Sequence, residues 1–145
     1  MKIQIIAAGQ LKQGPERELF QEYAKRLSYP IKLVEIAIRQ DKAIPASSYL
    51  KAITKEDFVI LLDEVGENLS SREFAKKINN LNETNKRLCF IIGGADGIPQ
   101  EVKNLSRFSI SFGKLTWPHL LVRALLAEQL YRTQQIISNH PYHRD

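Results

Sequence analysis

The stretch LCFIIGGADGIP (Leu88–Pro99) joins five consecutive apolar residues to a short loop that holds three glycines. An unbroken apolar run of this length, stopped by turn residues, is typical of a strand that is buried on both faces. The same pattern occurs in FVILL (Phe58–Leu62), which runs into DEVGEN. Two strands of this kind favour a parallel sheet with helices on both faces.

The rest of the chain alternates between strand-like and helical patterns. The predicted strands are Lys2–Ala8, Ile31–Ile38, Phe58–Leu62, Leu88–Ile92 and Phe108–Phe112, and DEVGEN is expected to be a loop. The predicted helices are Pro15–Leu27, Pro45–Glu56, one opened by a capping box of Ser70 and Glu73, Pro99–Leu105 and Pro118–Ser138. In the first of them, Leu19, Phe20, Tyr23 and Leu27 are expected to share one face. We therefore predict a single α/β domain over residues 1–145, built on a mostly parallel sheet.

Charge and cysteine content narrow the class of protein. The 145 residues include 21 Lys and Arg against 16 Asp and Glu, for a net charge of +5, which favours a polyanionic partner such as nucleic acid. The single cysteine, Cys89, excludes a disulfide scaffold and fits a reducing compartment. The first apolar run is too short for a signal peptide, and no run approaches a membrane span. A cytoplasmic protein without membrane contact is expected.

Three loops at the predicted strand ends could bind a ligand: DEVGEN, GGADGIP and GKLTWP. The glycines of GGADGIP would let the backbone approach a ligand, or they serve only as turn residues. Their spacing matches neither the dinucleotide fingerprint nor the phosphate-binding P-loop. A crevice with Leu62, Phe112, Leu115 and Trp117 would suit an adenosine without phosphates. Asp63 and Glu64 form an acid/base pair or are solvated turn residues.

The last predicted helix is apolar nearly all round, since Arg123 is the only polar residue of LLVRALLA (Leu120–Ala127). Such a helix must be covered on nearly all sides, and a second copy of the chain is the simplest cover, which predicts a homodimer. A buried arginine needs partners. An ion network that includes His119, one turn earlier, and a role in substrate binding are both open for Arg123. Glu128 and Arg132 are interpreted as a structural i,i+4 pair.

The tail NHPYHRD (Asn139–Asp145) allows three interpretations: a metal clip, a disordered end or a nucleic-acid contact. His140 and His143 are too few for zinc, which takes three or four ligands, so no metal is expected. A nucleic-acid contact would use Arg144 for phosphate and Tyr142 for stacking on a base. The last helix places the tail roughly 30 Å from the glycine loop. A catalytic tail would therefore serve the site of an antiparallel partner subunit.

Together, FIIGGADG, SFGKLTWPHLLVRALLAEQLYR and NHPYHR resemble the bacterial RlmH-type methyltransferases of the SPOUT superfamily. The resemblance implies a trefoil knot at the carboxyl end, a homodimer, and S-adenosylmethionine as the methyl donor. It also implies methylation of N3 of a pseudouridine in large-subunit ribosomal RNA, with the assembled ribosome as the expected substrate. Trp117 departs from the smaller apolar residue expected there, and Asp145 lies beyond the expected end.

The same resemblance assigns roles to single residues. Contacts to S-adenosylmethionine are expected at Leu62, Gly93, Phe112, Gly113, Lys114, Leu115, Thr116 and Trp117. The tail of one subunit is expected to complete the RNA site of the other. There, His143 is the first candidate for the base that takes the N3 proton, and His140 the second. Tyr142 and Arg144 are expected to orient the target base and its phosphate.

Two other functions remain open from the residues alone. A non-catalytic RNA-binding dimer would have no affinity for S-adenosylmethionine, and the intact GGADG and TWPH loops argue against it. An enzyme that binds another adenosine compound would show no salt-dependent affinity for ribosomes. The PYHR tail argues against that second alternative.

Overall fold

The computed structural model describes residues 1–40 and 42–145, which build one five-stranded sheet with the order β2-β1-β4-β3-β5. Every neighbouring pair of strands is parallel. The strands are β1 (Ile3–Ala8), β2 (Ile31–Ile36), β3 (Asp57–Asn68), β4 (Arg87–Ile92) and β5 (Phe108–Ser111). The α/β class predicted from the apolar runs is confirmed.

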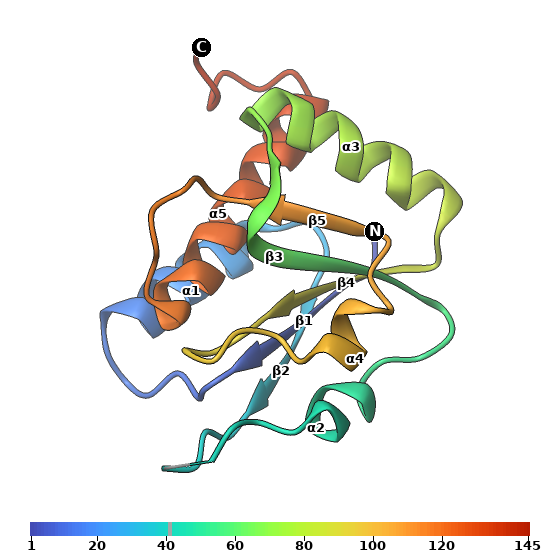
Figure 1. Ribbon diagram of the computed structural model, residues 1–145. Helices are drawn as coiled ribbons and strands as arrows, with labels where there is room; N and C mark the ends of the chain where they lie inside the picture. Colours follow the sequence, from blue (N-terminus) through green and yellow to red (C-terminus); the bar gives the residue numbers. More distant parts are fainter. Residues whose placement is uncertain (41) are drawn as a thin grey trace.

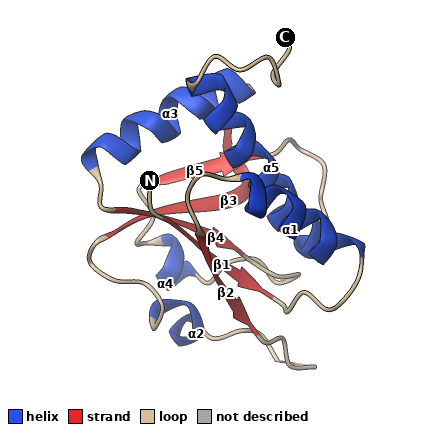
Figure 2. Ribbon diagram, turned by 180° about the vertical axis from the view of Figure 1, so that it is seen from behind, coloured by secondary structure: helices blue, strands red, loops and turns tan. Residues whose placement is uncertain are grey.

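Helices cover both faces of the sheet (Figure 1). The longer ones, α1 (Pro15–Arg26), α3 (Ser71–Thr84) and α5 (His119–Ile137), form one layer, and α5 lies between the other two. The short helices α2 (Ala46–Leu50) and α4 (Gln100–Lys103) lie on the opposite face (Figure 2). Within the described part of the chain, no helix is long and apolar enough to cross a membrane.

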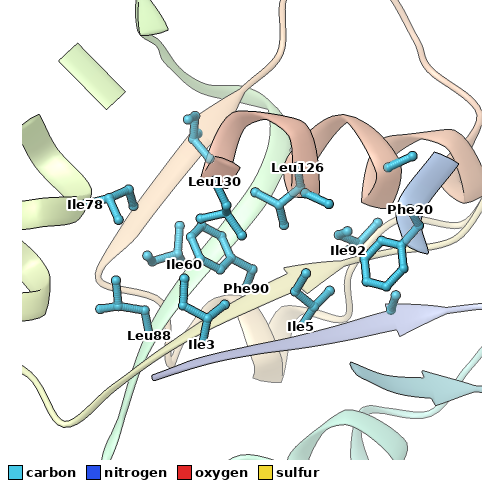
Figure 3. Packing of buried hydrophobic residues seen from close by; sticks show 14 of the residues in the cluster. Ile3, Ile5, Phe20, Ile60, Ile78, Leu88, Phe90, Ile92, Leu126 and Leu130 are labelled. Atoms are coloured by element: carbon cyan, nitrogen blue, oxygen red, sulfur yellow. The ribbon is translucent and has the colours of Figure 1, made fainter. Parts of the chain in front are cut away.

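Two of the three inner strands, β1 and β4, are buried along almost their whole length. β1 is buried at all six positions and β4 at five of six. Successive side chains point to opposite faces, so Ile5 and Phe90 pack against α5 (Figure 3), while Ile6 and Ile91 face the short helices. Because both faces are covered by helices, neither strand has a polar face to present to water.

Local signals placed two of the helices well. The capping box that opens α3 is present: Ser70 N–H donates to the Glu73 carboxylate at 2.7 Å, and Glu73 N–H donates to Ser70 Oγ at 3.2 Å. In α1, Phe20, Tyr23 and Leu27 pack into the core, but Leu19 is 39% exposed, so its predicted burial is wrong. Leu19 lies about 100° around the helix from Phe20, outside the stripe that faces α5.

Two predicted boundaries are corrected by the structure. The helix expected over residues 45–56 ends at Leu50, and a turn follows. DEVGEN is not a loop, since β3 continues to Asn68 with an irregularity: Leu62 and Glu67 both pair with Ile110. Residues 63–66, between these two positions, leave the pairing with β5 and form a bulge. A Cβ on Gly66 would lie 2.6 Å from the backbone of Ile110, so only glycine fits where β3 returns to β5.

Candidate functional site

A cavity of about 740 Å³ opens at the carboxyl ends of β4 and β5, between the loops that follow these strands and the bulge of β3 that begins after Leu62. Seven of the eight residues predicted to contact a cofactor line it: Leu62, Gly93, Phe112, Gly113, Leu115, Thr116 and Trp117. The eighth, Lys114, is exposed and lies outside the lining. Ligands of open α/β sheets bind at the carboxyl ends of the strands. The cavity lies at this edge of the sheet, and its volume is large enough for a small molecule.

The glycine loop forms a tight turn along one wall of the cavity. Gly97 N–H donates to the Gly94 carbonyl at 3.0 Å, and Gly97 has a φ of +76°. A Cβ on Gly93 would lie 2.8 Å from Ile98 Cγ1 and 2.9 Å from the Gly97 carbonyl. Gly93 is therefore required by the turn itself, and its lack of a side chain also leaves the backbone open to a ligand.

The loop from Phe112 to Pro118 is held by its own hydrogen bonds. Ser111 Oγ bonds both the carbonyl (2.8 Å) and the amide (3.1 Å) of Gly113. Trp117 Nε1 donates to the Phe112 carbonyl at 3.2 Å, which fixes the indole at the cavity rim. Thr116 donates to Glu64 at 2.9 Å and ties this loop to the bulge of β3. This wall of the cavity is therefore held in place by contacts within the chain.

The two carboxylates of the bulge make structural contacts. Asp63 accepts from the Val65 amide at 3.2 Å and pairs with Lys103 at 3.5 Å, while Glu64 accepts from Thr116. These contacts favour the interpretation as turn residues over an acid/base pair. The lining also includes Asp96, so three carboxylates face one lysine. That balance favours a ligand with a positive charge and disfavours a phosphate.

Arg123 is fully buried and joins α5 to the carboxyl ends of two strands. Its guanidinium donates to the carbonyls of Ala8 (2.7 Å) and Gly9 (3.0 Å) and to the Glu35 carboxylate (2.9 Å). Arg123 does not line the cavity, so the structure favours the ion network over substrate binding. His119, one turn earlier, does line it; burial and, second, the Arg123 charge lower the pKa of His119.

Helix α5 ends in a regular capping motif, which sets the direction of the tail that follows. Asn139 has a φ of +55°; its amide donates to the Ile136 carbonyl, and the His140 amide donates to the Gln135 carbonyl at 2.9 Å. These two bonds form a Schellman motif, in which asparagine takes the left-handed position that glycine usually fills. The interpretation as a disordered end is not supported.

Tyr142 and His143 dock on the last turns of α5. The Tyr142 hydroxyl donates to Glu128 at 3.1 Å, and its ring meets the Tyr131 ring edge-on at 4.8 Å. Burial, and after it the Tyr23 and Glu128 side chains, raise the pKa of Tyr142, so the phenol stays a hydrogen-bond donor at neutral pH.

Both ring nitrogens of His143 are occupied in this chain. Arg132 lies 3.1 Å from Nδ1, and since arginine has only donors, Nδ1 must accept. Nε2 then carries the proton and donates to Asp145 at 3.0 Å. Asp145 is in turn held by Arg72 at 2.7 Å. Both ring nitrogens of the imidazole therefore have partners within the chain, and these contacts orient the ring.

The tail and the cavity lie at opposite ends of α5. His119 at the start of the helix lines the cavity, whereas His140, Tyr142, His143 and Arg144 do not. The 19 residues of α5 span about 28 Å, and the carboxyl terminus lies beside α3 and the last turns of α5 (Figure 1). Within one chain, the two predicted parts of the site do not meet.

Sequence reasoning missed the part that Glu128 and Arg132 play. They do form the predicted i,i+4 pair, at 2.5 Å, but both also hold the tail, and the Arg132 guanidinium lies over the Tyr142 ring. The spacing of the pair is common on helix surfaces and carries no mark of this second role.

Among residues 1–40 and 42–145, no group of three or more His, Cys, Asp and Glu side chains is placed to hold a metal ion.

Comparison with known proteins gives a consistent result. Residues 1–143 match the family described as "Predicted SPOUT methyltransferase". Three similar curated proteins are each named ribosomal RNA large subunit methyltransferase H. They come from Zymomonas mobilis (42% identity, 100% of this chain and 99% of the relative), Paramagnetospirillum magneticum (41%, 99% of each) and Rhodospirillum centenum (40%, 99% of each).

Proposed function

Since the chain belongs to the SPOUT methyltransferase family, we propose that it methylates large-subunit ribosomal RNA in the cytoplasm, at N3 of a pseudouridine, with S-adenosylmethionine as the methyl donor. One observation carries the proposal for this chain: seven of the eight predicted cofactor residues line a single cavity. The residue types and the volume of that cavity suit an adenosine with a short amino-acid arm.

The charges of the cavity support the same ligand. S-adenosylmethionine supplies a sulfonium whose methyl carbon is already activated, and it carries no phosphate. Asp63, Glu64 and Asp96 give the lining a negative balance that suits this cation. Leu62, Phe112 and Leu115 offer apolar surface for an adenine ring. The prearranged loop at Phe112–Pro118 would hold the methyl group in line with an incoming nitrogen.

We infer that the working enzyme is a homodimer in which the tail of one subunit completes the site of the other. The large hydrophobic side chains of Val65 (87% exposed), Leu115 (73%) and Trp117 (41%) lie at or beside the cavity and need a cover. On α5, Leu121 and Leu125 are half-buried in the single chain. A partner that covers these residues could bring its own tail to this cavity.

Methylation of N3 releases a proton, so the site needs an acceptor. We keep His143 as the first candidate and His140 as the second. In the docked tail, His143 can take a proton at Nδ1 only if the contact with Arg132 breaks. We propose that bound RNA replaces that contact, and that Tyr142 and Arg144 position the target base and its phosphate.

The proposed function is tested by calorimetric titration with S-adenosylmethionine and by transfer of labelled methyl groups to ribosomes. We expect the unaltered protein to bind and to methylate. Gly93→Arg should abolish both, because even a Cβ does not fit at this position. Gln13→Arg adds the same side chain in an exposed loop and should bind normally. No binding and no transfer by the unaltered protein, even with ribosomes present, would contradict the proposal.

The role of His143 has its own test. His143→Ala should lower the methylation rate by about 10²- to 10⁴-fold while leaving the affinity for S-adenosylmethionine unchanged. An unchanged rate with RNA bound would exclude His143 as the base.

A further inference from the structure

A second hollow of about 610 Å³ lies at the carboxyl end of β2. We call it the β2 groove. Its lining comes from the end of β2, the residues that follow it, and α2: Gln10, Val34, Glu35, Ile36, Ala37, Arg39, Lys42, Ala43, Ile44, Pro45, Ser48 and Lys51. None of these residues lines the cofactor cavity, and neither the proposed chemistry nor the tail uses the groove.

Three of the four charged side chains that are described in the β2 groove are basic. Arg39, Lys42 and Lys51 are exposed, and none has an ion pair with any residue that the structure describes. Among the lining residues that the structure describes, Glu35 is the only acidic one, and its carboxylate is already bound by Arg123 (2.9 Å) and by the Leu11 amide (2.5 Å). The groove therefore presents three cations whose charge its own carboxylate does not cancel.

The two hollows differ in their balance of charge. Among the described lining residues of the β2 groove, three basic side chains stand against one carboxylate. The cofactor cavity has the opposite balance, with three carboxylates and one lysine. Two hollows of opposite sign indicate two ligands of opposite charge, and the β2 groove fits an anion.

The position of the β2 groove relates it to the proposed reaction. It lies at the same edge of the sheet as the cofactor cavity, because all five strands are parallel and both hollows are at strand carboxyl ends. A Cβ on Gly94, which lines the cavity, would lie 3.7 Å from Ile38 Cδ1. In the sequence, Ile38 lies between Ala37 and Arg39, which both line the groove. Strand spacing of about 5 Å puts β2 roughly 10–15 Å from β4 and β3.

We propose that the β2 groove binds the sugar–phosphate backbone of the RNA substrate, a few nucleotides from the base that is methylated. This inference rests on the proposed function, which makes RNA the substrate. Arg39, Lys42 and Lys51 neutralise phosphates and fix the position of the strand, and they take no part in the chemistry at N3. The groove supplies affinity, while the cofactor cavity and the tail supply the reaction.

The test replaces Arg39, Lys42 and Lys51 together by glutamine in the full chain, and in a second variant by alanine. Ribosome binding is measured at several salt concentrations, and S-adenosylmethionine binding by calorimetry. A control variant changes Lys12, Arg17 and Lys76 to glutamine. These control residues are also one arginine and two lysines, they are exposed, and they form no ion pair with any residue that the structure describes. The change in net charge is therefore equal.

We expect both groove variants to bind ribosomes roughly 10- to 100-fold more weakly near 0.1 M salt, with a salt dependence shallower by about two in log–log slope. The affinity for S-adenosylmethionine should stay unchanged, and the control should bind ribosomes nearly as the unaltered protein does. Equal losses in the groove and control variants, or none in either, would overturn the inference. An unaltered protein that does not bind or methylate ribosomes would instead overturn the proposed function, and the inference with it.

Discussion

At the scale of single residues, Arg123 shows how one buried charge can organise the functional edge of a sheet. Its donors hold two adjacent carbonyls at the end of β1 and the carboxylate of Glu35 on β2. The same carboxylate accepts from the Leu11 amide. The first turn of α5, from which His119 lines the cavity, is thereby fixed against two strands.

Arg123→Met should lower the free energy of unfolding by about 3–5 kcal/mol, because Glu35 and two carbonyls lose their buried donor. Glu35→Gln should cost less, about 1–2 kcal/mol, since an amide oxygen can still accept from both donors. Urea unfolding followed by circular dichroism measures both values. Equal losses in the two variants would contradict this account of the network.

The ion pair of Asp57 and Arg87 predicts that the free energy of unfolding depends on pH. Burial alone would raise the pKa of Asp57, but hydrogen bonds from Arg87 and from the Thr54 amide outweigh it and hold the pKa below its usual value. The stability from this pair is therefore present above the unfolded pKa of about 3.9 and is lost as pH falls through the lower folded pKa. Asp57→Asn should flatten the loss of stability between pH 5 and pH 2.

That change is checked by urea unfolding of both proteins at several pH values. The difference between them isolates Asp57 from other carboxylates whose pKa is also lowered, such as Glu73. A difference that stays constant across this pH range would show that the Arg87 pair does not shift Asp57.

At the scale of elements, the end of β3 forms one wall of the site. The strand leaves its pairing with β5 after Leu62 and resumes it at Glu67, so the bulge from Asp63 projects beside the cavity. Gly66 makes the return possible, since its backbone lies against that of Ile110. Thr116 then ties the bulge to the loop after β5.

Gly66→Ala should lower the free energy of unfolding by about 2–4 kcal/mol, because a Cβ would meet backbone atoms that cannot move aside. It should also weaken S-adenosylmethionine binding by displacing Asp63 and Glu64. Gly94→Ala is the matched control: its Cβ would find only ordinary contacts, 3.4 Å or more away, so its stability should change by less than about 1 kcal/mol. Similar thermal denaturation curves for the two variants would contradict the role given to Gly66.

At the scale of the whole molecule, α5 separates the two halves of the proposed site. The cavity lies at its first turn and the docked tail after its last. A shared site in a homodimer resolves this separation, because the two halves come from different subunits. The trefoil knot expected from the family resemblance stays a prediction, as does the dimer.

Shared sites predict complementation. Gly93→Arg damages the cavity and His143→Ala damages the tail, so each pure variant should be nearly inactive. A mixed dimer formed from both should contain one intact site of two, so the purified mixed dimer should recover about half of the unaltered activity. Co-expression with two different tags, purification of the mixed dimer and a ribosome methylation assay measure the recovery. No recovery in a verified mixed dimer would show that each chain builds its site alone.

Much of the fold and part of the site could be predicted from the sequence. Apolar runs mark strands buried on both faces, and the capping box of Ser70 and Glu73 marks the start of α3, because both signals depend on a few neighbouring residues. The strand-end rule located the cavity for a related reason: parallel strands put all their carboxyl ends at one edge.

Other features depend on contacts between residues far apart in the chain. The extension of β3, the partners of Arg123 and the docking of Tyr142 on Glu128 involve residues 14 to 115 positions apart, and no local pattern encodes such pairs.

The sequence alone was enough to predict the class of fold, the family, and two of the loops that line the cavity. The folded chain was needed to show that Arg123 is structural, that the tail is docked with both His143 nitrogens occupied, and that three cations gather at the end of β2. Periodicity and caps depend on neighbouring residues and report which side chains are buried locally. Hydrogen-bond partners and local charge depend on how distant segments pack.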